Sequence, residues 1–154
     1  MEQSNRGMGR PVAFGIDYLK RTKTKSVICL EAASAYWGMC SYSPDIPILL
    51  MPSDNGNRFI EMQISMMFVT DFSLDNTVDI GDGVKVTDRE RTVCDMIRYN
   101  RHEFHLYETV MSAFEDGEVD MEKLLKLARK YNIEERLYET YKKALEAYDE
   151  DNEQ

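Results

Sequence analysis

The chain has 154 residues, which is enough for one domain with a substantial core and too few for two ordinary domains. Its hydrophobic content of 43% is typical of a globular protein, and no apolar run reaches the roughly 18–20 residues that a membrane-spanning helix requires. The formal net charge of −9 disfavours direct binding to the phosphates of nucleic acid.

Charge is distributed unevenly along the chain. Residues 1–25 carry six Lys or Arg against two acids, whereas residues 100–154 carry fifteen Asp or Glu against eight Lys or Arg. We expect a flexible basic N-terminal arm over residues 1–25, and an acidic C-terminal half that suits a basic protein partner. The alternative is that the acids only keep the protein in solution. The polar start does not resemble a secretory signal, so we expect a cytoplasmic protein.

Residues 26–37 have the pattern of a buried helix. Their Ala residues allow close packing, and Gly38 is the expected C-terminal stop. Before this helix we expect disorder over residues 1–11 and a short helix or an extended segment over residues 12–19. Trp37 is expected in the core rather than as a binding anchor. The three cysteines are odd in number and lack metal-site spacing, which indicates reduced and mostly buried thiols.

A small sheet is expected between residues 48 and 86. The apolar run 48–51 is typical of a buried strand, and the partial alternation over 59–69 indicates a half-buried strand, so these two could form a hairpin. Two short strands, 78–80 and 84–86, flank a Gly-Asp-Gly turn that requires positive φ. The sheet should be antiparallel or mixed.

The central helix of the chain follows this sheet. Thr87 and Glu90 have the Thr-x-x-Glu spacing of a capping box, in which the Thr hydroxyl accepts from the third helical N–H and the Glu carboxylate accepts from the N–H of the cap. The spacing predicts Thr87 as the N-cap and a helix that begins at Asp88. Apolar residues recur downstream at helical spacing, which places one face of this helix in the core.

A ladder of opposite charges lies on the same helix. Asp95 comes four residues after Arg91 and three before Arg98, so its carboxylate should lie between two guanidinium groups on adjacent turns. One interpretation is a structural ion-pair network. The other is that Arg89, Arg91 and Arg98 bind an acidic partner while Asp95 positions them, since Arg is suited to bidentate recognition of carboxylate or phosphate. The sequence is compatible with both.

Three amphipathic helices are expected in the C-terminal half, over residues 102–115, 121–131 and 133–148. Asp120 is the expected cap of the second helix, and Asn132 marks its end. Residues 149–154 should form a disordered acidic tail. With the sheet, these helices predict an α+β (mixed α/β) fold, in which one domain over residues 26–148 combines a small sheet packed with helices and a bundle-like helical half.

Motifs for catalysis or metal binding are sparse. His102 and His105 lack the spacing of a His-Glu-x-x-His metal site, and the sequence contains neither a glycine-rich phosphate loop nor a Gly-x-Ser-x-Gly nucleophile motif. A two-metal site would need clustered carboxylates, and turn and cap roles already account for several candidates. These candidates are Asp79, Asp82, Asp88, Glu90 and Asp95. We therefore expect no enzymatic activity, no cofactor and no metal.

Two further stretches of the sequence carry short motifs. The first is Val84-Lys85-Val86-Thr87, followed by Glu90-Arg91-Thr92 and Asp95-Met96-Ile97-Arg98. The second is the Ala- and Ser-rich segment from Ile28 to Met39. Both stretches resemble the C-terminal domain of AbiEi-like antitoxins of type IV toxin–antitoxin systems, although Ala32 stands where the family often has Ser. The segment before residue 26 is shorter than the family's N-terminal winged helix-turn-helix domain, so we expect that domain to be lacking.

The resemblance implies a non-enzymatic antitoxin that counteracts a nucleotidyltransferase toxin in bacterial phage defence by abortive infection. The expected partner is that toxin or another protein, with weak or no direct nucleic-acid binding and no membrane. Besides the arginine set, the candidate contacts are Tyr107, Tyr138, Tyr141 and Tyr148 of the acidic helical half. The main alternative is a DNA-associated transcriptional regulator that contacts DNA through its basic arm or a partner. A nuclease or transferase with a carboxylate site is the third hypothesis.

Overall fold

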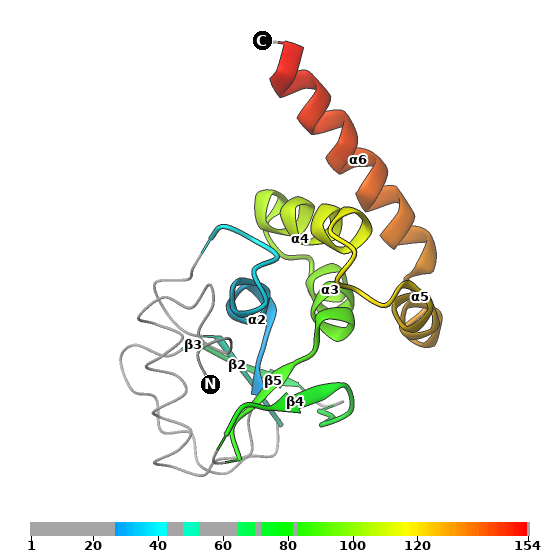
Figure 1. The fold of residues 1–154 in the computed structure, drawn as a ribbon. Helices are drawn as coiled ribbons and strands as arrows, with labels where there is room; N and C mark the ends of the chain where they lie inside the picture. Colours follow the sequence, from blue (N-terminus) through cyan, green and yellow to red (C-terminus); the bar gives the residue numbers. More distant parts are fainter. Residues whose placement is uncertain (1–26, 43–47, 53–64, 70–71, 82, 154) are drawn as a thin grey trace.

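The computed structural model describes residues 27–42, 48–52, 65–69, 72–81 and 83–153 (Figure 1). Within these ranges the chain forms a five-stranded sheet and five helices, which confirms the predicted α+β class. The helices are α2 (Leu30–Tyr36), α3 (Arg89–Arg98), α4 (Glu103–Glu115), α5 (Met121–Lys130) and α6 (Glu134–Glu153). The sheet lies at one end of the molecule beside α2, α3 occupies the middle, and α4, α5 and α6 form the other end (Figure 1). The expected arm over residues 1–25 lies outside the described ranges.

The sheet is mixed, as predicted. Its strands are β1 (Val27–Ile28), β2 (Ile48–Pro52), β3 (Ser65–Val69), β4 (Thr77–Asp79) and β5 (Lys85–Thr87), in the spatial order β3-β2-β1-β5-β4. β1 runs antiparallel to β2 and parallel to β5. β4 and β5 form the expected hairpin, with φ angles of 118° at Gly81 and 80° at Gly83, which a residue without a Cβ adopts readily.

The predicted hairpin between residues 48–51 and 59–69 is wrong. β2 and β3 are parallel neighbours, with Ile48 opposite Ser65. A tight turn reverses the chain and gives antiparallel strands, whereas parallel strands need a longer crossover connection that returns the chain to the same end of the sheet. The predicted turn at 53–57 and the first part of the predicted strand 59–69 lie outside the described residues.

The first helix starts later than predicted. Val27 and Ile28 form β1 instead of a first helical turn, because their β-branched side chains suit a strand and this strand is paired on both sides. Leu30 begins α2 with a left-handed φ of 54°, which costs a non-glycine residue roughly 1–2 kcal/mol and is maintained here by complete burial of the side chain. Gly38, with a φ of 73°, follows the helix end as predicted.

The central helix α3 begins one residue later than the capping-box prediction. Asp88 is its N-cap, because the Asp88 Oδ1 accepts a hydrogen bond of 2.8 Å from the Arg91 N–H. Thr87 is the last residue of β5 and lies opposite Thr77, and its hydroxyl is 2.7 Å from the Thr92 hydroxyl. The assignment of Thr87 as the cap is wrong, since strand pairing fixes its backbone and its side chain is fully buried.

The three C-terminal helices are present as predicted. Asp120 caps α5 by accepting a hydrogen bond of 3.1 Å from the Lys123 N–H, and Asn132 ends the helix with a left-handed φ of 58°. α6 continues to Glu153, so the prediction of a disordered tail is wrong for residues 149–153. No Gly or Pro follows Tyr148 to stop the helix.

Two hydrophobic clusters meet at α3. Met96 packs with β1, α2 and β5, in a cluster that includes the fully buried Ile28. Val93 and Ile97 pack instead with α4, α5 and α6, in a second cluster that includes Leu137. The helical end is therefore attached to the sheet through both faces of α3, which fixes the positions of α4 and α6.

Candidate interaction site

The predicted charge ladder on α3 is present and buried. Arg91 Nε donates to Asp95 Oδ2 at 3.2 Å, and Arg98 Nη1 donates to Asp95 Oδ1 at 3.2 Å. The Arg91 and Asp95 side chains are only 3% and 1% exposed. Burial raises the pKa of the Asp95 carboxyl above its ordinary value, although both guanidinium groups act to lower it. The ladder is an internal ion-pair network rather than a solvated one.

The ladder also connects α3 to its neighbours. Arg91 Nη1 donates to the carbonyls of Ser73 and Asp75, at 2.7 and 2.8 Å, and so holds the segment before β4 against the helix. The Arg98 guanidinium lies 3.9 Å from the centroid of the Tyr131 ring at the end of α5. Because Arg91 and Asp95 are enclosed, the geometry favours the structural interpretation of the ladder.

Arg89 is separate from the ladder. Its guanidinium lies 4.5 Å from the centroid of the Trp37 ring and pairs with Glu118 at 3.4 Å. Trp37 is itself held in place, because its Nε1–H donates to the Thr87 carbonyl at 2.8 Å. Trp37 is thus a part-buried structural residue, as expected, and Arg89 is the more exposed end of the predicted arginine set.

The second capping-box residue, Glu90, connects α3 to α5. Lys123 Nζ lies 2.7 Å from Asp88 Oδ2 and 3.1 Å from Glu90 Oε1, so that one ammonium bridges two carboxylates. The Asp120 N–H also donates to Glu90 Oε2 at 3.4 Å. These carboxylates therefore have structural partners, and no group of three metal-ligand side chains occurs in the described part of the chain.

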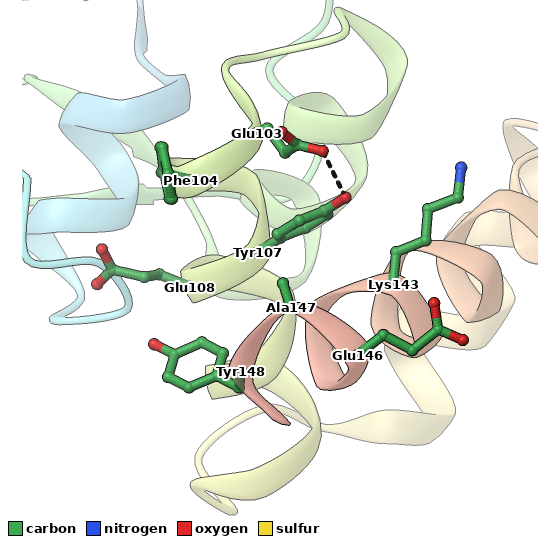
Figure 2. Close-up of a pocket in the computed structure, with 8 residues that line it drawn as sticks. All are labelled: Glu103, Phe104, Tyr107, Glu108, Lys143, Glu146, Ala147 and Tyr148. Carbon is green, nitrogen blue, oxygen red and sulfur yellow. Dashed lines mark hydrogen bonds between the residues drawn. The ribbon is translucent and has the colours of Figure 1, made fainter. Parts of the chain in front are cut away.

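A groove lies between α4 and α6 on the helical half (Figure 2). It encloses about 500 Å³ and is lined by Glu103, Phe104, Tyr107, Glu108, Lys143, Glu146, Ala147 and Tyr148. Tyr107 extends from α4 towards Ala147 of α6 (Figure 2), and its hydroxyl donates to Glu103 Oε1 at 2.8 Å. Two packed helices thus form the walls and expose polar and aromatic side chains along them.

Two exposed aromatic side chains line this groove. The Phe104 side chain is 69% exposed, the largest fraction among the exposed large hydrophobic residues of the described ranges, and Tyr148 is 45% exposed. Full burial of a Phe side chain contributes roughly 1.5–3 kcal/mol, and folding of this chain leaves most of that contribution unused at Phe104. Exposed aromatic side chains beside a concave surface are typical of protein interfaces.

Carboxylates outnumber cations at the groove. Glu103, Glu108 and Glu146 line it together with one ammonium, that of Lys143. Glu108 is anchored at the rim, because it accepts hydrogen bonds of 2.9 Å from both the N–H and the hydroxyl of Ser41. Burial raises the pKa of Tyr107, and its hydrogen bond to Glu103 contributes in the same direction. The groove therefore favours a cationic ligand surface over an anionic one.

The structure separates the four candidate tyrosines. Tyr107 and Tyr148 line the groove, whereas Tyr138 and Tyr141 do not. The Tyr141 ring stacks on Phe114, with ring centroids 4.1 Å apart. Tyr138 is 46% exposed on α6, outside the groove.

Phe104 is the contact candidate that the sequence analysis missed. It has the same helical spacing as the inward-facing residues of α4, so no signal in the sequence marks it as exposed.

The two histidines lie at the start of α4, close to the groove. His102 is the N-cap, since its Nδ1 accepts from the Phe104 N–H at 3.3 Å. The His105 ring stacks on Tyr42, with centroids 4.0 Å apart, and lies 5.0 Å from the His102 ring. Burial lowers the pKa of His105. The structure thus gives both histidines capping and stacking contacts.

Cys29 and Cys94 are buried free thiols, as predicted. Burial raises the pKa of the Cys94 thiol to about 12, so the thiol is protonated at neutral pH. No helix in the described part of the chain has the length and apolar character needed to cross a membrane. No protein-family model matches the chain, and a comparison with curated protein sequences finds no match.

Proposed function

We propose that this chain is a non-enzymatic interaction protein whose α4–α6 groove binds a protein partner. The observation that carries the proposal is the exposed aromatic pair at the groove, Phe104 and Tyr148, beside a lining in which three carboxylates face one ammonium. Apolar anchors surrounded by charged residues are the usual composition of a binding surface.

We further propose that the partner is a nucleotidyltransferase-type toxin and that the chain acts in the cytoplasm as an antitoxin against it. This step rests on the resemblance to AbiEi-like antitoxins over residues 84–98 and 28–39. Several of the matching residues, among them Arg91, Thr92 and Asp95, are buried in α3. The motif would therefore specify the scaffold of such an antitoxin, and the contact surface would lie elsewhere, on exposed residues of the helical half.

Charge supports a protein partner over nucleic acid. The α6 helix carries eight Asp or Glu against three Lys or Arg, and it forms one wall of the groove. A DNA duplex carries about one negative charge per 1.7 Å, so this face repels it. A basic protein surface would be attracted to the same face.

The test is to identify the gene beside the one that encodes this chain and to measure binding of its toxin-like product to the full chain. We expect binding, together with recovery of growth when the chain is co-expressed with that toxin. The variant Phe104→Ala should weaken both effects. Binding of random duplex DNA with micromolar affinity near physiological salt, by a chain that lacks residues 1–25, would overturn the proposal and support a DNA-associated regulator.

A further inference from the structure

The groove between α4 and α6 is longer than the hollow of Figure 2 alone. A second hollow of about 260 Å³ adjoins it and shares Glu103, Tyr107 and Lys143, so the two form one channel. Along α6 the lining extends from Arg136 to Tyr148. At 1.5 Å of rise per residue this distance is about 18 Å, the length of a helix of roughly three turns.

The end of the channel near the C-terminus of α6 has room for a bulky side chain. Ala147 is the smallest residue of the lining and lies opposite Tyr107 (Figure 2). Phe104 and Tyr148 lie at the same end and supply aromatic surface that is exposed in the free chain. A helix that docks in a groove presents apolar anchors at positions i, i+3, i+4 and i+7. A channel of this length can hold such a stripe, and the recess can take one of its bulky side chains.

Charge differs between the two ends of the channel. Arg101 and Arg136 line one end together with Glu139, and Arg101 is paired there with Glu31 at 2.7 Å. At the other end lie Glu108 and Glu146, and the exposed Asp149 follows the channel on α6. A ligand with uniform charge would fit only one of these ends.

We infer that the channel binds an amphipathic helix of a partner protein, with Lys or Arg concentrated in the half that lies over the C-terminal end of α6. A bulky apolar side chain of that helix packs over Ala147, between Tyr107 and Tyr148. This inference rests on the proposed function in one respect, since it requires that the partner be a protein. It does not require that the partner be a toxin.

A second copy of the chain is a less favourable occupant. Each copy carries a net charge of −9, and α6 alone has eight acids against three bases, so pairing of two such surfaces brings like charges together. A basic helix meets the opposite sign over the same surface.

The experiment uses the full chain and fluorescein-labelled helical peptides of about 14 residues, the length that spans the channel. The first peptide has Leu and Phe at i, i+3, i+4 and i+7 and Lys in one half. A second peptide replaces each Lys with Glu, and a third has the first composition in an order without an apolar stripe. We expect the first peptide to bind at least about tenfold more tightly than the other two by fluorescence anisotropy. Equal binding of the first and third peptides would overturn the inference.

Matched variants locate the site. Tyr148→Ala should weaken binding of the first peptide by about tenfold or more, whereas Tyr138→Ala, an equally exposed tyrosine of α6 outside the channel, should change it less than about twofold. Glu146→Lys should weaken binding of the first peptide, which carries Lys, and strengthen binding of the second peptide, which carries Glu. Equal effects of the two tyrosine variants, or a stable dimer in sedimentation that Tyr148→Ala dissociates, would overturn the inference.

The outcomes also separate this inference from the proposed antitoxin function. If the first peptide binds in the channel and no neighbouring toxin binds, the channel assignment holds and the antitoxin proposal fails. If a toxin binds and the first peptide does not bind the chain, the antitoxin proposal holds and the helix-binding inference fails.

Discussion

Replacement of Asp95 by Ala tests whether the buried ladder holds the two halves of the molecule together. The substitution leaves the Arg91 guanidinium, 3% exposed, with its hydrogen bonds to the Ser73 and Asp75 carbonyls but without the carboxylate beside it. Loss of one partner from a buried ion pair is strongly destabilising because the remaining charge is buried without compensation, and about 3–5 kcal/mol is typical. We expect Asp95→Ala to lower the free energy of unfolding by that amount.

A double-mutant cycle isolates the pair from the general effect of a core substitution. Arg91→Met should also lower the free energy of unfolding, because Asp95 then keeps only Arg98 as a partner. The double variant Arg91→Met, Asp95→Leu removes both charges, so its loss of stability should be smaller than the sum of the two single losses. Glu118→Ala is the control, since it breaks an ion pair in which Arg89 and Glu118 are both substantially exposed, and it should cost no more than about 1 kcal/mol.

Urea denaturation followed by far-UV circular dichroism measures these free energies, provided that the slope with urea is the same in all variants. If Asp95→Ala lowered the free energy of unfolding by less than about 1 kcal/mol, the ladder would behave like an exposed ion pair and the argument would be refuted. Additive single changes would refute it as well, since they would mean that Arg91 and Asp95 do not depend on each other in the folded state.

Three further predictions follow from the cap, the ladder and the groove. Thr87→Asp should destabilise the protein by more than about 2 kcal/mol, because Thr87 is fully buried. At a true N-cap, Asp would be tolerated, so thermal denaturation of this variant tests the reassignment of the cap. Folding raises the pKa of the Asp95 carboxyl. Its contribution to stability is therefore fully present below the pKa that it has in the unfolded chain, and is lost as pH rises through the pKa that it has in the folded protein. The stability gap between wild type and Asp95→Asn should therefore widen as pH falls from 7 to 4. Phe104→Gln should change the unfolding free energy by less than about 0.5 kcal/mol, since Phe104 is 69% exposed, although it weakens partner binding.

Local sequence signals predicted the elements that depend on local chemistry. Asp120 and Asn132 delimit α5 correctly, because a cap and a left-handed residue act within one turn of the helix. At α3 two adjacent residues, Thr87 and Asp88, are both good caps, and only the pairing of Thr87 with Thr77 across β4 and β5 determines which of them is used. The one-residue error therefore has a tertiary cause.

Elements that depend on distant partners could not be predicted in this way. The two-residue strand β1 exists because β2 and β5 flank it, and β2 pairs in parallel with β3, which lies farther along the chain. The ladder was correctly predicted as a set of contacts, since i, i+3 and i+4 spacing determines them, but its burial depends on the segment at Ser73 and on α5. The groove depends on the packing of α4 against α6, which no single stretch of sequence encodes.

Charged residues have two different roles in this molecule, and this division bears on its partners. Inside, Arg91 and Asp95 connect α3 to its neighbours and are enclosed. Outside, Glu103, Glu108 and Glu146 line the groove beside Phe104 and Tyr148. A substitution in the first group should change stability, whereas a substitution in the second should have little effect on folding and, if the proposed site is correct, should change partner binding. We therefore expect substitutions in the α4–α6 groove of this chain to change partner binding while the scaffold is kept, and substitutions in the arginine ladder to lower stability.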